Sequence, residues 1–496
     1  RIPAGLLRPA TAYYQVVGGR PRPWHQASVA LAVLVAWLAY GWLRHFGWSA
    51  RLGFWIALVF SLHPAHTSSV AWASGIQELL AATFCLGALA ALRWRSESAS
   101  KAPLVLSTLL FAAALLSKEV SAALLPFTAV WFWWERRNGA EGPLQIRLRQ
   151  AVAWFGALLA VYLVVRIAVL GGLTQPVPGA PSAFSAALAS PLAALTYVRL
   201  LVWPIEFSIF RPERPDLTLA SPAFWVTGLL QIGLIALAAW AIRRRPALLL
   251  PSTWFLVWLL PVLNLWALPA QWMVSDRYLF LPALALPWIL AIVLPRRAAV
   301  ATLAVLALAF AALTVRYSAI FASESAFVAA MVRAEPTSSI VFATQGGLRL
   351  SSGDRVGARL AFARAVELDP LAAAALLSLG DLEREAGDYG AAEGHYRQAL
   401  PVRPYASKPF KLLTIDLARA GYVHRARILI EEAGDRWPED FEVRLLETAL
   451  VARDGRRTAA EAAYSAAVRL RPDDPAVAGG LDATLGRLAP TLAFTP

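Results

Sequence analysis

Residues 370–403 read PLAAAALLSLGDLEREAGDYGAAEGHYRQALPVR, and this pattern returns every 34 residues through the last third of the chain. Four prolines and four glycines keep the spacing: Pro370, Pro404, Pro438 and Pro472, and Gly353, Gly387, Gly421 and Gly455. Two alanine series and one large apolar series share it: Ala358, Ala392, Ala426 and Ala460; Ala365, Ala399, Ala433 and Ala467; Phe362, Tyr396, Ile430 and Tyr464. A fixed period of this length indicates stacked copies of one small structural unit.

The order of these residues resembles the tetratricopeptide repeat, in which small residues mark the crossing of two helices and glycine marks the turn between them. The resemblance implies an α-solenoid of about four helix pairs over residues 339–474, with a capping helix near 476–489. Packing alone explains the small residues. We expect the groove of such a stack to bind a protein or peptide, which the sequence does not identify.

The sequence before residue 318 has the composition of a membrane protein. Apolar residues make up 58% of the chain and charged residues 16%. Apolar runs long enough to predict spanning helices occur at about 25–43, 51–62, 76–92, 103–117, 120–134, 151–170, 223–242, 252–266, 278–294 and 298–315. The sequence therefore predicts an all-α protein, with a polytopic membrane domain over 1–317, a connecting helix over 318–336 and the repeat domain over 337–496.

The net charge of +14 is unevenly distributed. Residues 1–336 contain 26 basic and 11 acidic side chains, whereas residues 337–496 contain 20 and 21. The nearly neutral repeat domain has no basic stripe, so we expect no nucleic-acid partner. The basic excess of the first part lies in the turns between apolar runs, as the positive-inside rule predicts for cytoplasmic turns.

Five basic turns fall on one side of the membrane if the apolar run 186–203 does not cross it. We therefore interpret 186–203, which contains Pro191 and ends at Trp203–Pro204, as an interfacial segment. This topology places the repeat domain outside the cytoplasm. Arginine dominates the basic residues and suggests a bacterium, so the prediction is a multi-pass protein of the bacterial inner membrane with a periplasmic repeat domain.

One predicted outer turn, from His63 to Glu78, contains unusual polar residues. Pro64 interrupts the helix, so we expect His63 and His66 near the outer water interface and Glu78 at the start of the returning helix. An ionisable residue at membrane depth is a functional candidate, and we assign Glu78 a catalytic role that His63 supports. The alternative is structural: the histidines cap backbone groups, and Glu78 interacts with a helix N-terminus.

Three cations are predicted on the same outer side: Arg8, Lys118 and Arg277. Such side chains hold phosphate through charge-assisted hydrogen bonds, so we assign them to a lipid-phosphate or substrate site that also includes His66, Glu119 and Asp276. Interfacial anchoring is the alternative for each cation. No further His or Cys accompanies the two histidines at metal-binding spacing, so we predict no metal site. Separately, a single cysteine, Cys85, excludes a framework of disulfides within the chain.

Several segments resemble, in order, the transmembrane and tetratricopeptide-repeat O-mannosyltransferases and their bacterial relatives. They are Leu7-Arg8-Pro9-Ala10-Thr11, His63-Pro64-Ala65-His66-Thr67, Val70-Ala71-Trp72, Gly75 to Leu80, Ser117-Lys118-Glu119 and Asp276-Arg277-Tyr278-Leu279-Phe280-Leu281-Pro282. The resemblance implies a GT-C-type fold that transfers a mannose-like sugar from a polyprenyl or dolichyl phosphate to a Ser or Thr hydroxyl outside the cytosol. The lipid-linked sugar is the donor substrate, and no cofactor is implied.

In that family the catalytic carboxylate comes from the first outer loop, but no Asp or Glu precedes Glu78 here. The sequence begins at Arg1 without Met, so we interpret it as truncated and expect the principal base upstream; the alternative is that this member lacks the catalytic acid. It also has Ser68 where many relatives have an acid and Ile76 where many have Arg.

Two other functions fit parts of this pattern. A non-catalytic membrane scaffold would use the repeats to dock partners, and its outer polar residues would tolerate substitution. A lipid-linked polysaccharide ligase or polymerase would need a large outer loop rich in Arg and His. The longest outer stretch, 171–222, has only Arg199, Arg211 and Arg214 and no histidine, so the ligase ranks third.

Overall fold

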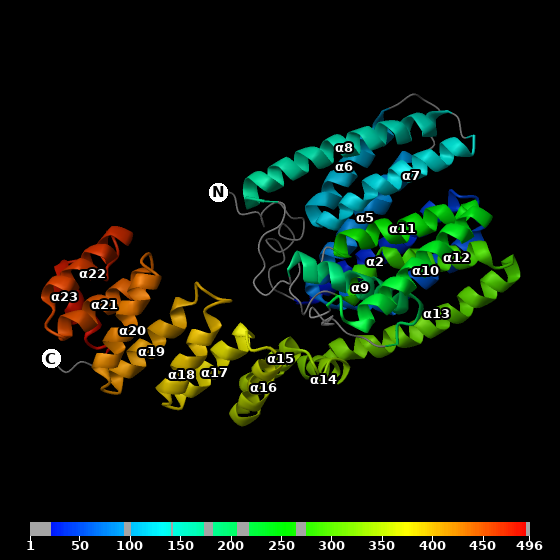
Figure 1. Cartoon of the computed structure of the whole chain (residues 1–496). Helices are drawn as coiled ribbons and strands as arrows, with labels where there is room; N and C mark the ends of the chain where they lie inside the picture. The colour runs from blue at the N-terminus through cyan, green and yellow to red at the C-terminus, as the bar shows by residue number, and fades with distance from the viewer. Residues whose placement is uncertain are drawn as a thin grey trace. The chain divides into compact units, whose positions relative to one another are not determined.

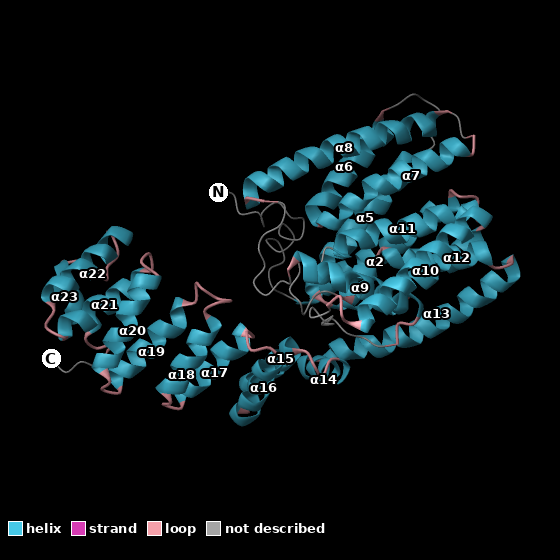
Figure 2. Ribbon diagram, viewed as in Figure 1, coloured by secondary structure: helices cyan, strands magenta, loops and turns pink. Residues whose placement is uncertain are grey.

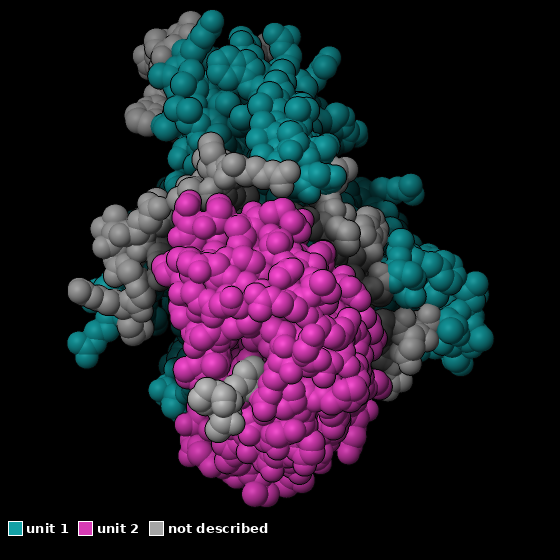
Figure 3. All heavy atoms as spheres, turned by 90° about the vertical axis from the view of Figure 1, so that its left-hand side faces the viewer, with its two compact units in different colours: residues 1–336 teal, residues 337–496 magenta. Residues whose placement is uncertain are grey.

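The computed structural model describes residues 21–93, 101–139, 142–172, 182–205, 218–263 and 274–492. Within these ranges the secondary structure is helical, without a β-strand, which confirms the predicted all-α class (Figures 1 and 2). The chain divides into two compact units, residues Arg1–Pro336 and Thr337–Pro496 (Figure 3).

The first unit is a bundle of apolar helices. Its longer helices are α2 (Pro21–Arg44), α3 (Ala50–Ser61), α5 (Ile76–Leu92), α6 (Ala102–Ser117), α7 (Leu124–Arg137), α8 (Pro143–Leu170), α9 (Ala183–Val202), α10 (Pro222–Arg244), α11 (Leu249–Leu259), α12 (Ala285–Val293), α13 (Arg296–Ser318) and α14 (Glu324–Ala334). Each predicted apolar run therefore contains a helix, and α14 occupies most of the predicted connecting segment.

Short 3₁₀ turns replace the ends of three predicted helices. The run 120–134 starts with η4 (Glu119–Ala123), and the run 252–266 ends in η6 (Leu260–Leu263), beyond which residues 264–266 lie outside the described ranges. The run 278–294 starts with η9 (Asp276–Leu279) and η10 (Pro282–Leu284) before α12 begins. Proline lacks a backbone N–H and restricts the residue before it, which explains the break near Pro282.

Six helices of the described ranges are long and apolar enough to cross a membrane: Arg22–Arg44, Pro143–Leu170, Ala183–Val202, Pro222–Arg244, Pro246–Leu263 and Arg296–Ala322. Three shorter apolar helices accompany them. The segment Pro64–Ala71 and the helix Ile76–Leu92 form a pair bent by 111°, which is a broken span or a re-entrant loop. These helices are compatible with membrane association.

Much apolar surface of this unit faces outward. No side chain of α10 is buried, and Leu229 and Ile232 are 66% and 65% exposed. Soluble monomers rarely expose continuous apolar patches of this kind. A lipid environment gives these side chains an apolar solvent, and it leaves the backbone groups satisfied inside each helix.

The basic turns of the bundle are close in space and define its basic end. Arg93, after α5, donates a hydrogen bond of 2.8 Å to the carbonyl of His45, after α2. It also lies 3.6 Å from Glu135 near the end of α7. Arg245, after α10, donates to the carbonyls of Ile292 and Val293 at the end of α12. Turns that are distant in sequence thus meet at this end of the bundle.

The other end of these helices contains the bent segment and defines the site end. Thr314 of α13 donates a hydrogen bond of 2.9 Å to the carbonyl of Leu62, directly after α3. Helix α9 packs here, because Ala186 and Leu200 share an apolar cluster with Val262 and Leu279. Since α9 also has the length of a membrane span, its interfacial position remains a prediction.

The second unit consists of four helix pairs and one further helix. The pairs are α15 (Ser339–Ser351) with α16 (Arg355–Leu368), α17 (Ala373–Glu385) with α18 (Tyr389–Ala399), α19 (Ser407–Arg419) with α20 (Val423–Arg436), and α21 (Phe441–Arg453) with α22 (Arg457–Leu470). Helix α23 (Gly480–Leu488) follows. The 34-residue period predicted four pairs, and a capping helix was expected near 476–489; the predicted α-solenoid is confirmed.

The periodic residues have the predicted structural roles. The four spaced glycines lie in the turns within the pairs with φ between +75° and +88°, a backbone region that favours glycine. The eight spaced alanines are at most 2% exposed at the helix contacts. At Gly380 an added Cβ would overlap the Tyr396 ring, so this helix crossing requires glycine.

The end of the chain packs against the helices of earlier repeats. Leu485 and Leu488 contact the apolar cluster that contains Leu413 and Leu417 of α19, and Leu492 is fully buried in that cluster. Arg419 donates a hydrogen bond of 2.8 Å to the carbonyl of Thr491. The residues after the predicted capping helix α23 therefore reach past the last pair to α19.

Candidate functional site

Glu78 lies in the first turn of α5, where a tight chain reversal positions it. The chain turns through η2 (Pro64–His66), α4 (Thr67–Ala71) and η3 (Ala73–Gly75) before α5 begins. A Cβ at Gly75 would lie 2.5 Å from the Cα and carbonyl oxygen of Ser69, so only glycine allows this close approach of two backbones. The Glu78 side chain is 7% exposed, and the start of a helix favours its negative charge.

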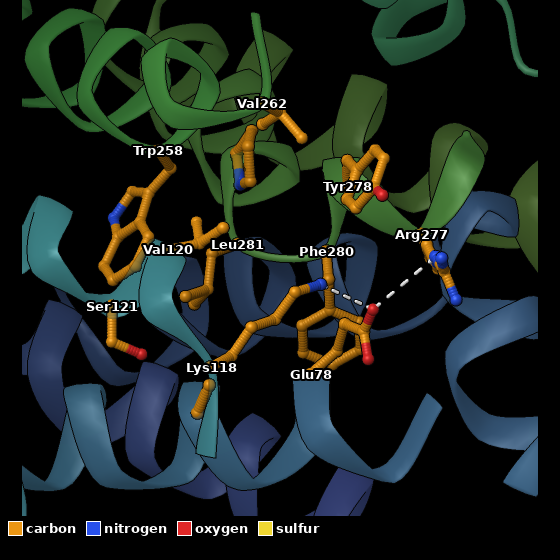
Figure 4. A pocket seen from close by; sticks show the side chains of 12 residues that line it. Glu78, Lys118, Val120, Ser121, Trp258, Val262, Arg277, Tyr278, Phe280 and Leu281 are labelled. Atoms are coloured by element: carbon orange, nitrogen blue, oxygen red, sulfur yellow. Dashed lines mark hydrogen bonds and ion pairs between the residues drawn. The ribbon is translucent and has the colours of Figure 1, made fainter. Parts of the chain in front are cut away.

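Lys118 and Arg277 converge on Glu78 from two other segments (Figure 4). Lys118, in extended conformation between α6 and η4, donates a hydrogen bond of 2.6 Å from Nζ to Glu78 Oε1. Arg277 Nε, from η9, lies 3.8 Å from the same oxygen. Two predicted cations and the predicted acid, far apart in sequence, thus form one cluster with a formal excess of one positive charge.

Tyr278 contributes an aromatic surface to this cluster. Lys118 Nζ lies 4.9 Å and Arg277 Cζ 5.3 Å from the centre of its ring, within the range of cation–π attraction. Sequence reasoning included Tyr278 in a motif but gave it no role. The sequence signal for this role was the position of Tyr278 directly after the predicted cation Arg277.

The cluster lines a small cavity. The space for water-sized molecules is about 30 Å³, which holds one or two waters. Its other walls are mostly apolar and include Val120, Trp258, Val262, Phe280 and Leu281. Arg277 Nε is buried without a hydrogen-bond partner. The carboxylate of Glu78 therefore occupies the position in which an external anion would meet both cations.

His63 and His66 are not at a water interface, contrary to our expectation. They are 1% and 5% exposed, because α9 and the 276–280 segment cover the helix break at Pro64. The N–H of Ala65 donates to His63 Nδ1, so Nε2 carries the proton and donates to the carbonyl of Leu201 at 3.1 Å. His66 Nε2 donates to the carbonyl of Phe280 at 3.0 Å. Both rings connect the bent segment to distant parts of the chain.

Two further predicted site residues, Glu119 and Asp276, do not line the cavity. Glu119 is exposed although it follows Lys118 directly, and it does not line the cavity. Asp276 is buried at the start of η9 and does not line the cavity either. Arg8 lies outside the described residues. Among the described residues, no group of three or more His, Cys, Asp or Glu side chains could hold a metal ion.

The repeat unit has its own hollow, of about 600 Å³, at the turns before α19 and α21. Asp440 accepts hydrogen bonds from Ser407 at 2.6 Å and from Lys411 at 3.0 Å. Burial disfavours the charged carboxylate, but these hydrogen bonds outweigh it and lower the pKa of Asp440. Tyr405 at the rim is 90% exposed. Charged and aromatic groups are thus available to a protein partner.

Comparison with known proteins finds a match within the second unit. A tetratricopeptide repeat family model matches residues 344–409. No curated protein matches the chain. Similar solved structures include the APC/C hetero-tetramer Cut9–Hcn1, with 12% identity over 88% of this chain and 89% of that chain and a TM-score of 0.26. Yeast Tom70 shows 12% identity over 93% of this chain and 95% of that chain, with a TM-score of 0.19. The family match therefore supports a tetratricopeptide-repeat domain within the second unit, over at least residues 344–409.

Proposed function

We propose that this protein is a membrane glycosyltransferase of GT-C type that uses a polyprenyl-phosphate sugar as donor. It transfers the sugar to a Ser or Thr hydroxyl of a protein on the extracytoplasmic side, and the repeats bind the acceptor or a partner. The meeting of Lys118 and Arg277 around Glu78 carries the proposal, because two cations in an apolar wall can stabilise a phosphate leaving group.

In this proposal Lys118 and Arg277 recognise the phosphate, and Glu78, for which the sequence suggested a catalytic role, positions these two cations. In the apolar surroundings of the cluster, charge-assisted hydrogen bonds to phosphate are stronger than in water. The basic end and the site end lie at opposite ends of the bundle, which supports an extracytoplasmic site if the positive-inside rule sets the orientation. The proposed location is the inner membrane of a bacterium, with the repeat domain in the periplasm.

The test uses the full chain in lipid nanodiscs with a radiolabelled polyprenyl-phosphate mannose and a Ser/Thr-rich acceptor peptide. Lys118→Ala and Arg277→Ala are each expected to weaken donor binding at least tenfold, because each removes a charged hydrogen-bond partner of the phosphate. Arg297→Ala is the matched control, since it removes an exposed cation from the turn at the basic end.

The scaffold hypothesis predicts a different result. If the unaltered chain neither binds the donor nor transfers sugar, and both cation variants retain partner binding through the repeats, the glycosyltransferase proposal is wrong. Equal donor binding by Lys118→Ala and Arg297→Ala would remove the assignment of the phosphate site.

A further inference from the structure

The first helices of the repeat pairs form one side of the stack, and part of this side is apolar. Helix α17 contacts α19, and α19 contacts α21, so these helices line the same side. Residues 34 apart occupy equivalent places on it. Two such places hold Asp381 and Arg384 in α17, Ile415 and Ala418 in α19, and Ala449 and Ala452 in α21. The charged groups of α17 thus give way to an apolar surface on α19 and α21, called here the apolar inner face.

Residues 481–492, the covering segment, lie on this surface. Helix α23 lies beside α21 (Figure 1). Its hydrogen-bond pattern continues beyond its end, because Ala489 N–H donates to the Leu485 carbonyl at 3.0 Å and Leu492 N–H to the Leu488 carbonyl at 3.2 Å. This continuation puts the three leucines at the i, i+3 and i+7 positions of one helical face. All three join the apolar cluster of α19 and α21.

A hydrogen bond from the end of α19 adds to these apolar contacts. Arg419 Nε donates to the carbonyl of Thr491 at 2.8 Å. The Leu492 side chain is fully buried, and Leu488 also packs against the cluster that contains Leu445 of α21. Aliphatic anchors at helical spacing on an apolar surface are the contacts that an amphipathic helix makes in a protein groove. The covering segment therefore occupies the apolar inner face in the manner of a bound helical peptide.

Helix α23 is less firmly built than the helices that it covers. Among its nine residues Thr484 is the one that is buried, whereas eight of the 13 residues of α21 are buried. It contains Gly486, which lowers helix propensity, and isolated helices of this length are marginal in water. The side chains of Thr484 and Arg487 donate to the carbonyl of Ala476, in the loop before α23. The three leucines and Arg419 therefore supply the attachment to the apolar inner face that the described residues show.

We propose that the covering segment is an internal ligand, which an amphipathic helix of a partner protein displaces from the apolar inner face. The partner helix carries large aliphatic side chains at i, i+3 and i+7, because Leu485, Leu488 and Leu492 have this spacing on the same surface. The proposal rests on the partner-binding role proposed for the repeats and is independent of sugar transfer. A tethered competitor has an effective concentration on the order of millimolar, so it excludes weakly binding helices.

Exchange of the same segment between two copies of this chain would use the same chemistry. The start of the segment argues against it. Val477, shortly before α23, is 4% exposed, and its carbonyl accepts a hydrogen bond of 2.8 Å from Tyr464 of α22. The segment is thus fixed to its own last repeat, which favours local displacement by a partner.

The test is peptide binding to the full chain in nanodiscs, measured by fluorescence anisotropy. The probe is a labelled synthetic peptide with the sequence of residues 479–492. The double variant Leu488→Asp/Leu492→Asp puts charge into the apolar contact, so its own segment detaches. This variant is expected to bind the peptide at least tenfold more tightly than the unaltered chain does, because the tethered competitor is removed.

The matched control is Gly486→Asp/Thr491→Asp, which adds the same two charges at exposed positions of the same segment. It is expected to bind the peptide as weakly as the unaltered chain. Equal peptide affinity of all three chains, or absence of binding to the Leu488→Asp/Leu492→Asp chain, would overturn the proposal.

Hydrogen exchange measures displacement in the unaltered chain, without any substitution. With isotopically labelled peptide at saturation, the amides of residues 481–492 of the chain are expected to exchange faster, while those of residues 413–419 in α19 stay protected. Continued protection of residues 481–492 at saturation would contradict displacement. A dimer of the unaltered chain that Leu492→Asp abolishes would assign the surface to a second copy and would also overturn the proposal. None of these readouts involves the sugar donor, so their failure is distinguishable from failure of the transferase proposal.

Discussion

Replacing Glu78 by glutamine is expected to strengthen the binding of polyprenyl phosphate. In the structure the Glu78 carboxylate takes the position of an external anion, 2.6 Å from Lys118 Nζ and 3.8 Å from Arg277 Nε. A phosphate that uses both cations must first displace this carboxylate. Glutamine keeps the shape and a hydrogen-bonding oxygen but removes the charge, so displacement costs less free energy.

The size of the effect follows from the geometry. At 2.6 Å and an effective dielectric constant of about 20, the Coulomb attraction between Lys118 and Glu78 is roughly 6 kcal/mol before desolvation is subtracted. Net values are smaller: about 1.5–3 kcal/mol for a hydrogen bond to a charged group and about 0.5–1.5 kcal/mol for a neutral one. The difference of about 1–1.5 kcal/mol corresponds to roughly tenfold tighter phosphate binding.

The assay is a fluorescence titration of the nanodisc-embedded chain with a labelled polyprenyl phosphate. Glu119→Gln is the control, because Glu119 is exposed beside Lys118 and outside the cavity lining. If the transferase proposal is correct, sugar transfer by Glu78→Gln falls even though phosphate binding rises, since the proposal gives the Glu78 carboxylate a role in the transfer step beyond phosphate binding. Unchanged or weaker binding by Glu78→Gln would refute the idea that the carboxylate occupies the anion position.

Three further outcomes are expected. Gly75→Ala places a Cβ 2.5 Å from backbone atoms of Ser69, so it should lower the free energy of unfolding by about 1–3 kcal/mol, and with it the melting temperature and donor binding. The control is Gly41→Ala, which has open space around its Cβ and should not destabilise α2. Asp440→Asn keeps the helix cap but weakens the pairing with Lys411; because the pKa of Asp440 is lowered, the charged carboxylate stabilises the fold above its usual pKa of 3.8. The stability difference from the unaltered chain, about 1 kcal/mol at neutral pH, should disappear as the pH falls through the lowered pKa in urea unfolding followed by circular dichroism. A reporter enzyme fused after residue 474 should be active outside the cytoplasm, and cytoplasmic activity would contradict the proposed orientation.

The repeat domain was predictable from sequence because its determinants are local. Glycine in each turn and alanine at each helix crossing recur every 34 residues, so the helix pairs follow from the period alone. The apolar helices were predictable for a similar reason, since length and hydropathy indicate them. Their exact ends were not, because prolines such as Pro282 convert the predicted helix start into 3₁₀ turns.

The site was only partly predictable. Glu78, Lys118 and Arg277 were selected as ionisable residues on one side of the bundle, but their direct contact depends on how α5, η4 and η9 pack, which no sequence spacing contains. The predicted exposure of His63 to water was wrong, because the burial of this side chain also depends on how the helices pack. A helix break at a proline suggested water, whereas α9 and the 276–280 segment supply its ring with carbonyl partners and cover it.

Helix α10 illustrates a different kind of selection. None of the 23 residues of α10 is buried, so packing against neighbouring helices places few demands on its side chains. If α10 spans a bilayer, its length and hydrophobicity are the main constraints on its sequence. Exchanges among Leu, Ile, Val and Phe at positions such as Leu229 should accumulate freely in related sequences. A single added charge near the helix centre should be rare, because it impairs insertion. If α10 spans a bilayer, it is expected to form there as an independent element before it packs against the other helices.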